Sequence, residues 1–451
     1  MAEQVDVVVV GLGPGGEDVA GRLAEAGLEV VGIEQRLVGG ECPYFACVPT
    51  KMMVRAADLL AEGRRIPGMA GSATVQPDWA PVARRIRAEA TDDWNDKVAV
   101  DRFVGKGGRF VRGSGRLVGP GKVAVGDQEF EARRGVVLAT GTEPAVPPIP
   151  GLAGTPYWTN REAVQATAAP ESLLLIGGGA VGVEFAQVFA RFGASVTVIE
   201  ALDRLVAVEE PEASALIARV FAAEGITVRT GAAAREVRHD GSRFTVMLDG
   251  GDVTGDQLLV ATGRRVDVAA LGVDSVGLDA AAPAVVVDDR LRAGPGLWAL
   301  GDLTGKGAFT HVAMYHAGII VRDILGENGP PADYRALPRV TFTDPEIGTV
   351  GKTEAAARQA GIRVRTGHTE LPSSARGWIH KAGNDGFIKL VEDADRGVLI
   401  GATSAGPAGG EVMAALAVAV HGEVPVERLR HMIYAYPTFH RAIEAALADL
   451  S

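Results

Sequence analysis

Two cysteines, Cys42 and Cys47, are the residues of this sequence whose type and spacing most directly suggest chemistry. They are the only cysteines among 451 residues, and Pro49 and Lys51 follow them closely. Secreted scaffolds that use disulfides as structural staples carry many cysteines, so a single close pair favours redox chemistry. The alternative is that both residues are buried, reduced thiols that pack as small hydrophobic side chains.

The spacing of the pair constrains the backbone around it. Two residues five apart on an ideal helix lie about 7.5 Å apart along its axis, whereas the Cα atoms of a disulfide lie within about 7 Å of each other. A bridged pair therefore requires a kinked or only partly helical segment, which Pro43 and Pro49 would favour. A disulfide in such a short, strained loop is expected to be exchangeable.

A glycine-rich turn near the N-terminus has the pattern of a dinucleotide-binding loop. The apolar run Val5–Val10 predicts a buried parallel strand, and a helix to about Ala26 is expected after the turn. A second predicted strand, Glu29–Ile33, ends in Glu34. In this arrangement the pyrophosphate lies on the helix N-terminus and the acid accepts hydrogen bonds from a ribose. The glycines of this first turn are Gly11, Gly13, Gly15 and Gly16.

The same pattern recurs in the middle of the chain. A predicted strand, Leu173–Ile176, leads into a second glycine turn, a helix through Phe192 and a strand, Ser195–Ile199, that ends in Glu200. The turn contains Gly177, Gly179, Val181 and Gly182. Two such patterns predict two bound dinucleotides on two doubly wound domains. The acid Glu200 favours NAD, whose ribose has a free 2′-hydroxyl, over NADP, although Arg204 lies four residues later and could bind a 2′-phosphate. The alternative is that Glu200 is only a polar residue at the end of a strand.

Composition narrows the class of protein and of partner. With 47% hydrophobic residues, 5% aromatic residues and 59 glycines, the chain fits an α/β protein rich in tight turns. The net charge of −11 argues against binding to nucleic acid or to an anionic membrane surface. No apolar run reaches the length of about 18–20 residues that spans a bilayer, and the first strand contains Asp6 and leads into a glycine motif rather than a cleavage site. We therefore expect a cytoplasmic protein.

The cysteine segment resembles the redox-active motif of the class I FAD-dependent pyridine nucleotide-disulfide oxidoreductases, G-G-T-C-x-N-x-G-C-x-P-S-K. Dihydrolipoamide dehydrogenase, glutathione reductase and mercuric reductase belong to this family. Both cysteines match, as do Gly39, Gly40, Pro49 and Lys51, whereas Glu41, Tyr44, Phe45, Ala46 and Thr50 depart from the commonest form. Further family motifs follow in order at Thr140-Gly141, Gly263, Asp302, His311–Ala313 and Val340–Gly348, so the resemblance covers nearly the whole chain.

This resemblance implies the cofactor contacts. The FAD contacts would be Gly11, Gly13, Gly15, Gly16, Glu34, Gly40, Thr140, Gly141, Asp302, His311 and Ala313. The NAD contacts would be Gly177, Gly179, Val181, Gly182, Glu200 and Gly263. Electrons would pass from NADH through the flavin to the disulfide and on to an acceptor.

The resemblance also implies catalytic roles. Cys47 would lie against the flavin as the charge-transfer thiol, and Cys42 would face the substrate as the interchange thiol. A thiolate beside a flavin and a helix N-terminus is expected to have a lowered pKa. Lys51 would pair with Glu184 near the flavin and stabilise negative charge there. Alternatively, Lys51 and Glu184 are separate solvated charges.

The expected fold is α/β, with two Rossmann-like domains and a C-terminal α+β dimerisation domain. The predicted FAD domain comprises residues 1–150 and 271–335, the NAD domain residues 151–270, and the dimerisation domain residues 336–451. Helices are expected over Met52–Gly63 and Trp79–Val104. The family forms homodimers in which the C-terminal segment completes the partner's active site.

The C-terminus departs from the family pattern H-P-T-x-x-E, in which the histidine is the acid/base. Here Tyr436 stands in the histidine position and Arg441 in the glutamate position. A phenol with a pKa near 10 is a poor base at neutral pH compared with an imidazole whose pKa is about 6.5. His440 and Glu444, each one helical turn further along, could form a displaced dyad.

Three functional hypotheses follow. The leading hypothesis is an NADH-dependent flavoprotein disulfide reductase that acts on an unidentified disulfide or dithiol. The second is an electron transferase acting on a quinone or a metal ion. Mercuric reductases also lack the histidine, but they carry a C-terminal cysteine pair that is absent here. The third is a flavin-binding redox sensor without turnover, and the intact motifs for both nucleotides argue against it.

Overall fold

The structure is a computed structural model that describes residues 2–451, and the chain divides into two compact units. Unit 1 contains the residues up to Thr50 together with Ala83–Ala145 and Gly263–Asp333. Unit 2 contains Lys51–Val82, Val146–Thr262 and Tyr334–Ser451. The chain first passes from unit 1 to unit 2 inside one helix, α3 (Cys47–Arg65).

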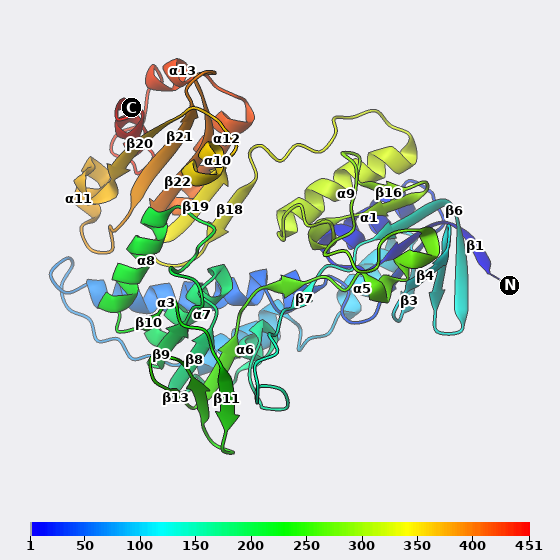
Figure 1. The fold of residues 1–451 in the computed structure, drawn as a ribbon, viewed down its shortest axis with the longest axis horizontal. Coiled ribbons are helices and arrows are strands. Elements are labelled where there is room, and N and C mark those ends of the chain that lie inside the picture. Colours follow the sequence, from blue (N-terminus) through cyan, green and yellow to red (C-terminus); the bar gives the residue numbers. More distant parts are fainter. Residues whose placement is uncertain (1) are drawn as a thin grey trace. The chain divides into compact units, whose positions relative to one another are not determined.

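Unit 1 is built on an eight-stranded sheet (Figure 1). Its main strand order is β16-β17-β6-β1-β2-β3, and β5 joins β4 to β6. The contacts of β1 with β2 and β6, of β2 with β3 and of β17 with β6 are parallel. The strands are β1 (Glu3–Val10), β2 (Val30–Glu34), β3 (Arg109–Arg112), β4 (Arg116–Gly119), β5 (Lys122–Val125), β6 (Gln128–Leu138), β16 (Arg292–Gly294) and β17 (Leu297–Ala299).

The apolar residues Val7–Val10 are almost completely buried because helices cover the central strands of this sheet. Helices α1 and α9 pack together there (Figure 1). The helices of unit 1 are α1 (Pro14–Glu25), α2 (Glu41–Tyr44), η1 (Ile86–Ala90), α5 (Lys97–Gly105), η2 (Ala269–Leu271), η3 (Val273–Val276), η4 (Gly301–Thr304) and α9 (Thr310–Leu325). A short ribbon of β7 (Glu143–Pro144) and β15 (Arg264–Arg265) completes the unit.

The prediction of one continuous helix over Trp79–Val104 is wrong. The segment forms α4 (Ala80–Arg85), the π-helix η1 and α5, with a break before α5. At this break Asp92, Asp93 and Trp94 have φ values of +47° to +56°. A helix cannot continue through residues in the left-handed region.

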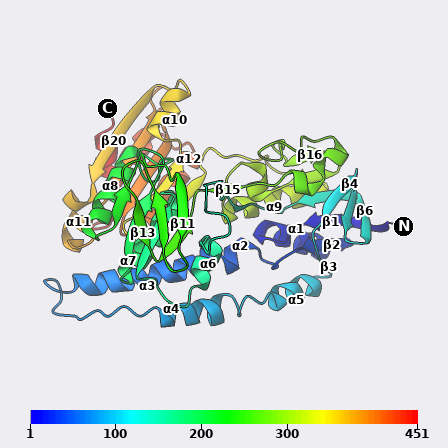
Figure 2. The same ribbon diagram turned by 60° about the horizontal axis from the view of Figure 1, so that its bottom comes forward.

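Unit 2 contains a four-stranded parallel sheet with the order β10-β9-β8-β14, consistent with the second Rossmann-like pattern. A three-stranded antiparallel sheet, β11–β13, packs its apolar residues with it in one core. The strands are β8 (Ser172–Ile176), β9 (Ser195–Ile199), β10 (Thr227–Arg229), β11 (Glu236–His239), β12 (Phe244–Met247), β13 (Val253–Gly255) and β14 (Gln257–Val260). The helices are α6 (Asn160–Gln165), α7 (Ala180–Arg191) and α8 (Pro211–Ala223). Helix α3 begins at Cys47, earlier than the expected Met52, and runs beside α7 (Figure 2).

The C-terminal part of unit 2 is an antiparallel sheet with the order β18-β19-β22-β21-β20 (Figure 1). Side chains of α12, α13 and α14 bury one face of it, around Ile388, Leu390 and Ala402. The strands are β18 (Pro338–Thr341), β19 (Glu346–Gly351), β20 (Val364–Glu370), β21 (Phe387–Asp393) and β22 (Val398–Gly406). The helices are α10 (Glu354–Gln359), η5 (Leu371–Ser373), α11 (Ala375–His380), α12 (Gly409–His421), α13 (Val426–Arg430) and α14 (Ala442–Ala448).

Across residues 2–451, none of the helices combines the length and the apolar character needed to cross a lipid bilayer.

Candidate active site

The cysteine pair lies where one short helix ends and a long one begins. Cys42 is in α2, and Cys47 is the first residue of α3. The amides of Phe45 and Ala46 both donate to the carbonyl of Glu41, at 2.8 Å. This closes α2 after a single turn, so the segment is only partly helical, as a bridged pair would require.

Glycines allow this segment to approach the first nucleotide turn. Gly39 and Gly40 have φ values of +105° and +68°, which favour glycine. The amide of Gly39 donates to the carbonyl of Leu12 at 2.7 Å. A Cβ atom on Gly40 would lie 2.8 Å from the Cα atom of Gly13. The cysteine segment is therefore held directly against the glycine turn of unit 1.

The two thiols meet at the N-terminus of α9. The Sγ atom of Cys47 lies 3.4 Å from Oγ1 of Thr310, the first residue of that helix. A hydrogen bond between the Cys42 side chain and Cys47, together with burial, raises the pKa of the Cys42 thiol well above its usual range, and Thr310 partly opposes this effect. Negative charge on Cys47 also opposes ionisation of Cys42. The lowered thiol pKa expected from the sequence concerned the thiolate beside the flavin, Cys47, and for that residue it stays a prediction.

Thr310 was not among the residues that the sequence pointed to. The one feature of the sequence that could have pointed to Thr310 is its position immediately before His311, which the family resemblance marks as a flavin contact. A hydroxyl here can donate to a thiolate, and the N-terminus of the sixteen-residue helix α9 favours negative charge.

The break before α5 supports the cysteine segment from the other side. The indole Nε1 of Trp94 donates to the carbonyl of Tyr44 at 3.2 Å. Asp96 accepts from the amide of Val38 at 2.8 Å and from Arg112. The left-handed residues that end the expected helix thus place a tryptophan against α2.

Lys51 and Glu184 form a close ion pair in unit 2. The Nζ atom of Lys51 lies 2.5 Å from Oε2 of Glu184, whose side chain is only 10% exposed. The other carboxylate oxygen accepts from the amide of Phe342 at 2.8 Å. The view that Lys51 and Glu184 are separate solvated charges is wrong, because the pair is direct and half-buried.

The first glycine turn has the shape that a dinucleotide pyrophosphate needs. A Cβ atom on Gly11 would lie 2.5 Å from the carbonyl oxygen of Ala139, and one on Gly16 would lie 2.0 Å from that of Gly11. Gly13 is different, because a Cβ atom there would meet none of the described residues within 4 Å, apart from its own neighbours along the chain. Close packing around an open Gly13 leaves room at the N-terminus of α1, so these residues fit FAD.

The acid at the end of β2 is oriented by the same turn. The carboxylate of Glu34 accepts from the amide of Leu12 at 2.9 Å and from the amide of Arg36 at 2.7 Å. Two backbone donors hold the carboxylate beside the glycine turn, where a ribose hydroxyl would meet it.

The second glycine turn repeats this construction in unit 2. Cβ atoms on Gly177 and Gly182 would lie 2.3 Å from the carbonyl oxygen of Ala261 and 2.0 Å from that of Gly177, whereas the position at Gly179 is open. The carboxylate of Glu200 accepts from the amide of Gly178 at 2.5 Å and from that of Leu202 at 2.7 Å. The second turn therefore fits a pyridine nucleotide, and Glu200 is more than a polar strand end.

Arg204, which complicated the choice between NAD and NADP, makes contacts within its own loop. Its guanidinium donates to the carbonyls of Ala207 and Glu209 at 2.6 and 2.9 Å, and to the hydroxyl of Ser214 at 2.7 Å. These bonds stabilise the loop before α8.

The remaining residues expected at the nucleotides lie close to these turns. Thr140 and Gly141 follow β6, and His311 and Ala313 lie in the first turn of α9. A Cβ atom on Gly15 would lie 2.8 Å from the carbonyl oxygen of Ala313. In unit 2, Val181 lies in the first turn of α7. Gly263 is the first residue of a segment of unit 1, and its carbonyl accepts from the amide of Ala145 at 2.9 Å; its expected place at NAD stays a prediction.

Asp302 lies in a polar cluster that also contains one of the departures from the family pattern. Its carboxylate accepts from Oγ1 of Thr142 at 2.7 Å and lies 3.8 Å from Nε of Arg264. Arg264 also donates to the carbonyl of Thr142 at 2.7 Å and lies 4.0 Å from the carboxylate of Glu41. Glu41 thus has a cationic neighbour beside the cysteine segment.

The C-terminal segment differs from the expected arrangement. Tyr436 is 70% exposed, and Arg441 lies over its ring, at 5.5 Å from the centroid. Helix α14 begins only at Ala442, so the assumption that Tyr436 and His440 lie one helical turn apart is wrong. Glu444, the acid considered for a dyad with His440, forms an ion pair with Arg441 at 2.9 Å.

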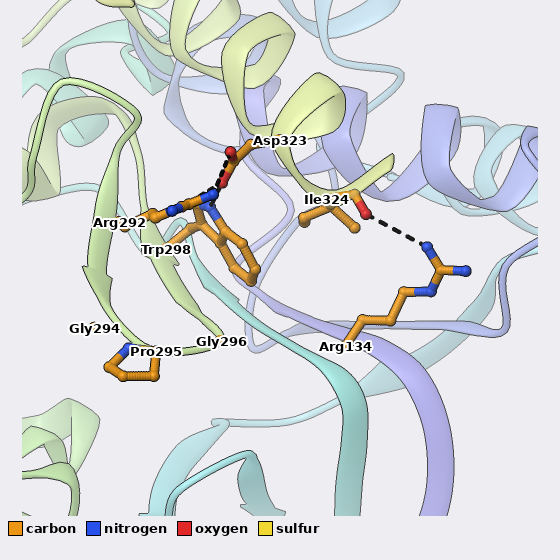
Figure 3. A pocket seen from close by; sticks show the side chains of 8 residues that line it. All are labelled: Arg134, Arg292, Gly294, Pro295, Gly296, Trp298, Asp323 and Ile324. Atoms are coloured by element: carbon orange, nitrogen blue, oxygen red, sulfur yellow. Dashed lines mark hydrogen bonds and ion pairs between the residues drawn. The ribbon is translucent and has the colours of Figure 1, made fainter. Parts of the chain in front are cut away.

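A cavity of about 520 Å³ lies elsewhere in unit 1, near the end of α9 (Figure 3). There the carboxylate of Asp323 accepts from Arg292 at 2.6 and 2.7 Å and from the indole of Trp298 at 2.8 Å. Arg134 donates to the carbonyl of Ile324 at 3.4 Å (Figure 3). These bonds stabilise the C-terminal end of the helix, and we assign the cavity no catalytic role.

Comparison with known families agrees with this geometry. The family model for pyridine nucleotide-disulphide oxidoreductase matches residues 5–317, and the model for the dimerisation domain of the same family matches residues 337–447. The chain belongs to the pyridine nucleotide-disulphide oxidoreductase family. The expected α/β class and the suspected family are thereby confirmed, and the protein is a flavoprotein enzyme that uses FAD and a pyridine nucleotide.

Relatives within the pyridine nucleotide-disulphide oxidoreductases come from more than one branch. A mercuric reductase of Acidithiobacillus ferrooxidans is 32% identical, over 98% of this chain and 82% of that protein. A dihydrolipoyl dehydrogenase of Chlorobaculum tepidum is 31% identical, over 100% of this chain and 97% of that protein. The match to the dimerisation domain supports a homodimer.

Two solved structures share the fold over almost the whole chain. The Cu(II) complex of RclA, an HOCl-induced flavoprotein disulfide reductase from Escherichia coli, has a TM-score of 0.87 at 25% identity and covers 99% of each chain. LpdA from Mycobacterium tuberculosis has a TM-score of 0.86 at 26% identity, also over 99% of each chain.

Proposed function

We propose that this enzyme passes electrons from NADH through FAD to the pair Cys42–Cys47, and from Cys42 to a small-molecule disulfide. The observation that carries this proposal is the meeting of the two thiols at Thr310 on the N-terminus of α9. Bound FAD supplies the carrier that accepts a hydride from the nicotinamide and reduces the cysteine disulfide. The reduced pair Cys42–Cys47 then holds these two electrons and passes them to the acceptor.

The two cysteines have different roles in this proposal. Cys42, in α2, attacks one sulfur of the acceptor disulfide, forms a mixed disulfide and releases one thiolate. Cys47 then attacks the sulfur of Cys42 and releases the second thiolate, so two electrons leave the pair as its disulfide forms again. Thr310 stabilises the thiolate of Cys47 through its hydroxyl and the N-terminus of α9.

Lys51 provides a positive charge at the flavin in this proposal. It lies one helical turn after Cys47 in α3, and its ammonium is held by Glu184. A fixed cation stabilises negative charge that develops on the reduced cofactor.

The nucleotide donor is proposed to be NADH. Glu200 can accept hydrogen bonds from a free 2′-hydroxyl, whereas its charge repels a 2′-phosphate. The contacts of Arg204 within its own loop support this choice, because its guanidinium already has three partners there.

The homodimer is proposed to complete each active site with the C-terminal segment of the partner. In that position Tyr436 replaces the histidine that serves as proton donor and acceptor in the family pattern. Because a phenol with a pKa near 10 transfers protons poorly at neutral pH, the acceptor should be one that depends little on such a relay.

A soft metal ion is the second candidate acceptor. The same exposed Tyr436 favours it, since a metal bound by two thiolates needs no proton relay for its reduction. The mercuric reductases among the relatives and the Cu(II) complex of RclA support this candidate.

Anaerobic turnover with a panel of acceptors tests the proposal. NADH oxidation is measured with lipoamide, glutathione disulfide, Hg(II), Cu(II) and ferricyanide, for the wild type and for Cys42→Ser. We expect Cys42→Ser to abolish reduction of the best disulfide or metal acceptor while NADH still reduces the flavin. Cys47→Ser is the matched control. Like Cys42→Ser it should abolish this reduction, and in addition it should remove the long-wavelength absorbance of a thiolate against flavin. A Cys42→Ser enzyme that keeps full turnover with the best acceptor would contradict a route through the thiols.

A further inference from the structure

A row of polar side chains connects α3, α7 and the turn that follows β18, all within unit 2. On α3 the contributing residues are Lys51, Asp58 and Arg65, each seven residues apart, and on α7 they are Glu184, Gln187 and Arg191. Residues spaced by three, four or seven lie on one face of a helix. The two helices therefore turn polar faces toward each other and toward residues 342–344.

Phe342 contacts both members of the Lys51–Glu184 pair. Its amide donates to Oε1 of Glu184 at 2.8 Å, while Lys51 binds Oε2 at 2.5 Å. The ring of Phe342 lies under the ammonium of Lys51, at 4.5 Å from Nζ to the centroid. The position of this one residue thus sets the orientation of the carboxylate and of the lysine.

The turn after Phe342 is held by the next polar residue of α7. The side-chain amide of Gln187 accepts from the amide of Asp344 at 2.7 Å and donates to the carbonyl of Asp344 at 2.9 Å. Gln187 is only 3% exposed. A buried amide that satisfies both main-chain groups of one residue fixes the course of that segment.

Charged residues reinforce the same turn. The carboxylate of Asp344 accepts from Arg191 at 2.7 Å and from Arg65 at 2.6 Å. Arg191 also donates to Asp58 at 2.7 Å, which ties α3 to α7. Loss of Arg191 would leave partly buried carboxylates uncompensated and endanger folding, so Gln187, which is neutral, is the better residue to test.

We propose that Gln187 is a positioning residue for the active site: it holds the Asp344 turn so that the Phe342 amide and ring orient Glu184 and Lys51. This inference rests on the proposed role of Lys51 at the flavin. Without the amide of Gln187, the Asp344 main chain loses two hydrogen bonds and the turn can move away from Glu184.

The midpoint potential of the bound flavin tests this inference in the holoenzyme. Lys51→Met should shift the potential to a more negative value, because it removes the cation that stabilises the reduced cofactor. Gln187→Met, which removes the amide at similar side-chain length, should shift it in the same direction by a smaller amount. In the double variant Gln187→Met should add nothing, because its effect acts through Lys51. Val188→Ala, a buried change on the same helix, is the control and should leave the potential unchanged.

Other results would contradict either the positioning role of Gln187 or the role of Lys51. A wild-type potential in Gln187→Met, or an equal shift with and without Lys51, overturns the positioning role while leaving the role of Lys51 intact. A wild-type potential in Lys51→Met overturns the role of Lys51, and the positioning role with it. If Gln187→Met does not fold, Gln187→Glu keeps the acceptor for the Asp344 amide, and the same comparison with Lys51→Met applies to it.

Discussion

Glu34 and Glu200 hold corresponding positions in the two nucleotide-binding turns of this chain. Each carboxylate accepts from the amide 22 residues earlier, in the glycine turn, and from the amide two residues later. The two turns are therefore alike in the hydrogen bonds that orient each carboxylate as well as in their glycines. Because the two acids are oriented alike, each should recognise the ribose of its own dinucleotide.

Gly13 should be required for binding FAD and dispensable for the fold. Its φ of −64° and ψ of −178° are accessible to any residue, and apart from its chain neighbours none of the described residues lies within 4 Å of its Cβ position. Gly13→Val should therefore purify folded but with FAD content reduced about tenfold or more, since a clash worth about 1.4 kcal/mol already weakens binding tenfold. The ratio of flavin to protein absorbance measures this.

Gly16→Ala is the contrasting variant, because its Cβ would lie 2.0 Å from the carbonyl oxygen of Gly11. It should lower the thermal midpoint of the apoprotein, whereas Gly13→Val should not. A Gly13→Val protein with a full complement of FAD would refute the placement of the pyrophosphate.

Glu200 should determine the preference for NADH. Glu200→Gln removes the charge that repels a 2′-phosphate and keeps an oxygen that can accept from a backbone amide. The ratio of kcat/KM for NADH to that for NADPH should fall about tenfold, the equivalent of about 1.4 kcal/mol. Glu34→Gln, the corresponding change in the first turn, is the control and should leave this ratio unchanged. Strong preference of the wild type for NADPH would contradict the assignment.

The C-terminal segment should limit turnover of lipoamide. We expect weak activity, because the absent imidazole removes a proton-transfer contribution typically worth about 10²–10⁴-fold. Tyr436→His should restore activity only in part, since Arg441 lies over this side chain and opposes a charged imidazole. Tyr436→His combined with Arg441→Glu should exceed either single change in steady-state assays. Wild-type turnover of lipoamide equal to that of the best other acceptor would show that the segment already contains an effective base.

His316 should make unit 1 less stable in mild acid. It is fully buried, and its Nδ1 accepts from the amide of Gly301 at 3.1 Å. Burial, and secondarily Lys306, lowers the pKa of this imidazole from 6.5 to about 4. A lowered folded-state pKa contributes stability above pH 6.5 that is lost as the pH falls toward 4, because the unfolded chain binds the proton first. At pH 5 the loss relative to pH 7.5 should be about 2 kcal/mol.

Thermal unfolding of His316→Asn at the two pH values checks this expectation. Asparagine keeps an acceptor for the Gly301 amide and removes the titration, so its midpoint should fall less between pH 7.5 and pH 5 than that of the wild type. His421→Asn, a change at an exposed position, is the control and should follow the wild type. Equal falls in His316→Asn and in the wild type would contradict the prediction.

The sequence alone determined the nucleotide turns, the redox pair and the family. These features are local, since a glycine turn, the strand before it and the acid after it are encoded within one short segment. The close packing of Gly11 against Ala139 and the open position at Gly13 are what such a pattern requires. The departures at Tyr436 and Arg441 could also be read directly, because they occupy fixed places in a motif.

Only the tertiary structure decided which polar groups meet across segments. Thr310 reaches Cys47 although 263 residues separate them, and Phe342 and Gln187 hold the Lys51–Glu184 pair through bonds that no local pattern predicts. The break at Asp92–Trp94 was also missed, since helical periodicity continues through residues whose backbone turns left-handed. Hydrogen bonds between distant segments depend on how helices and strands pack. The spacing of hydrophobic residues predicts helices and strands, but it does not predict which polar faces of two helices contact each other.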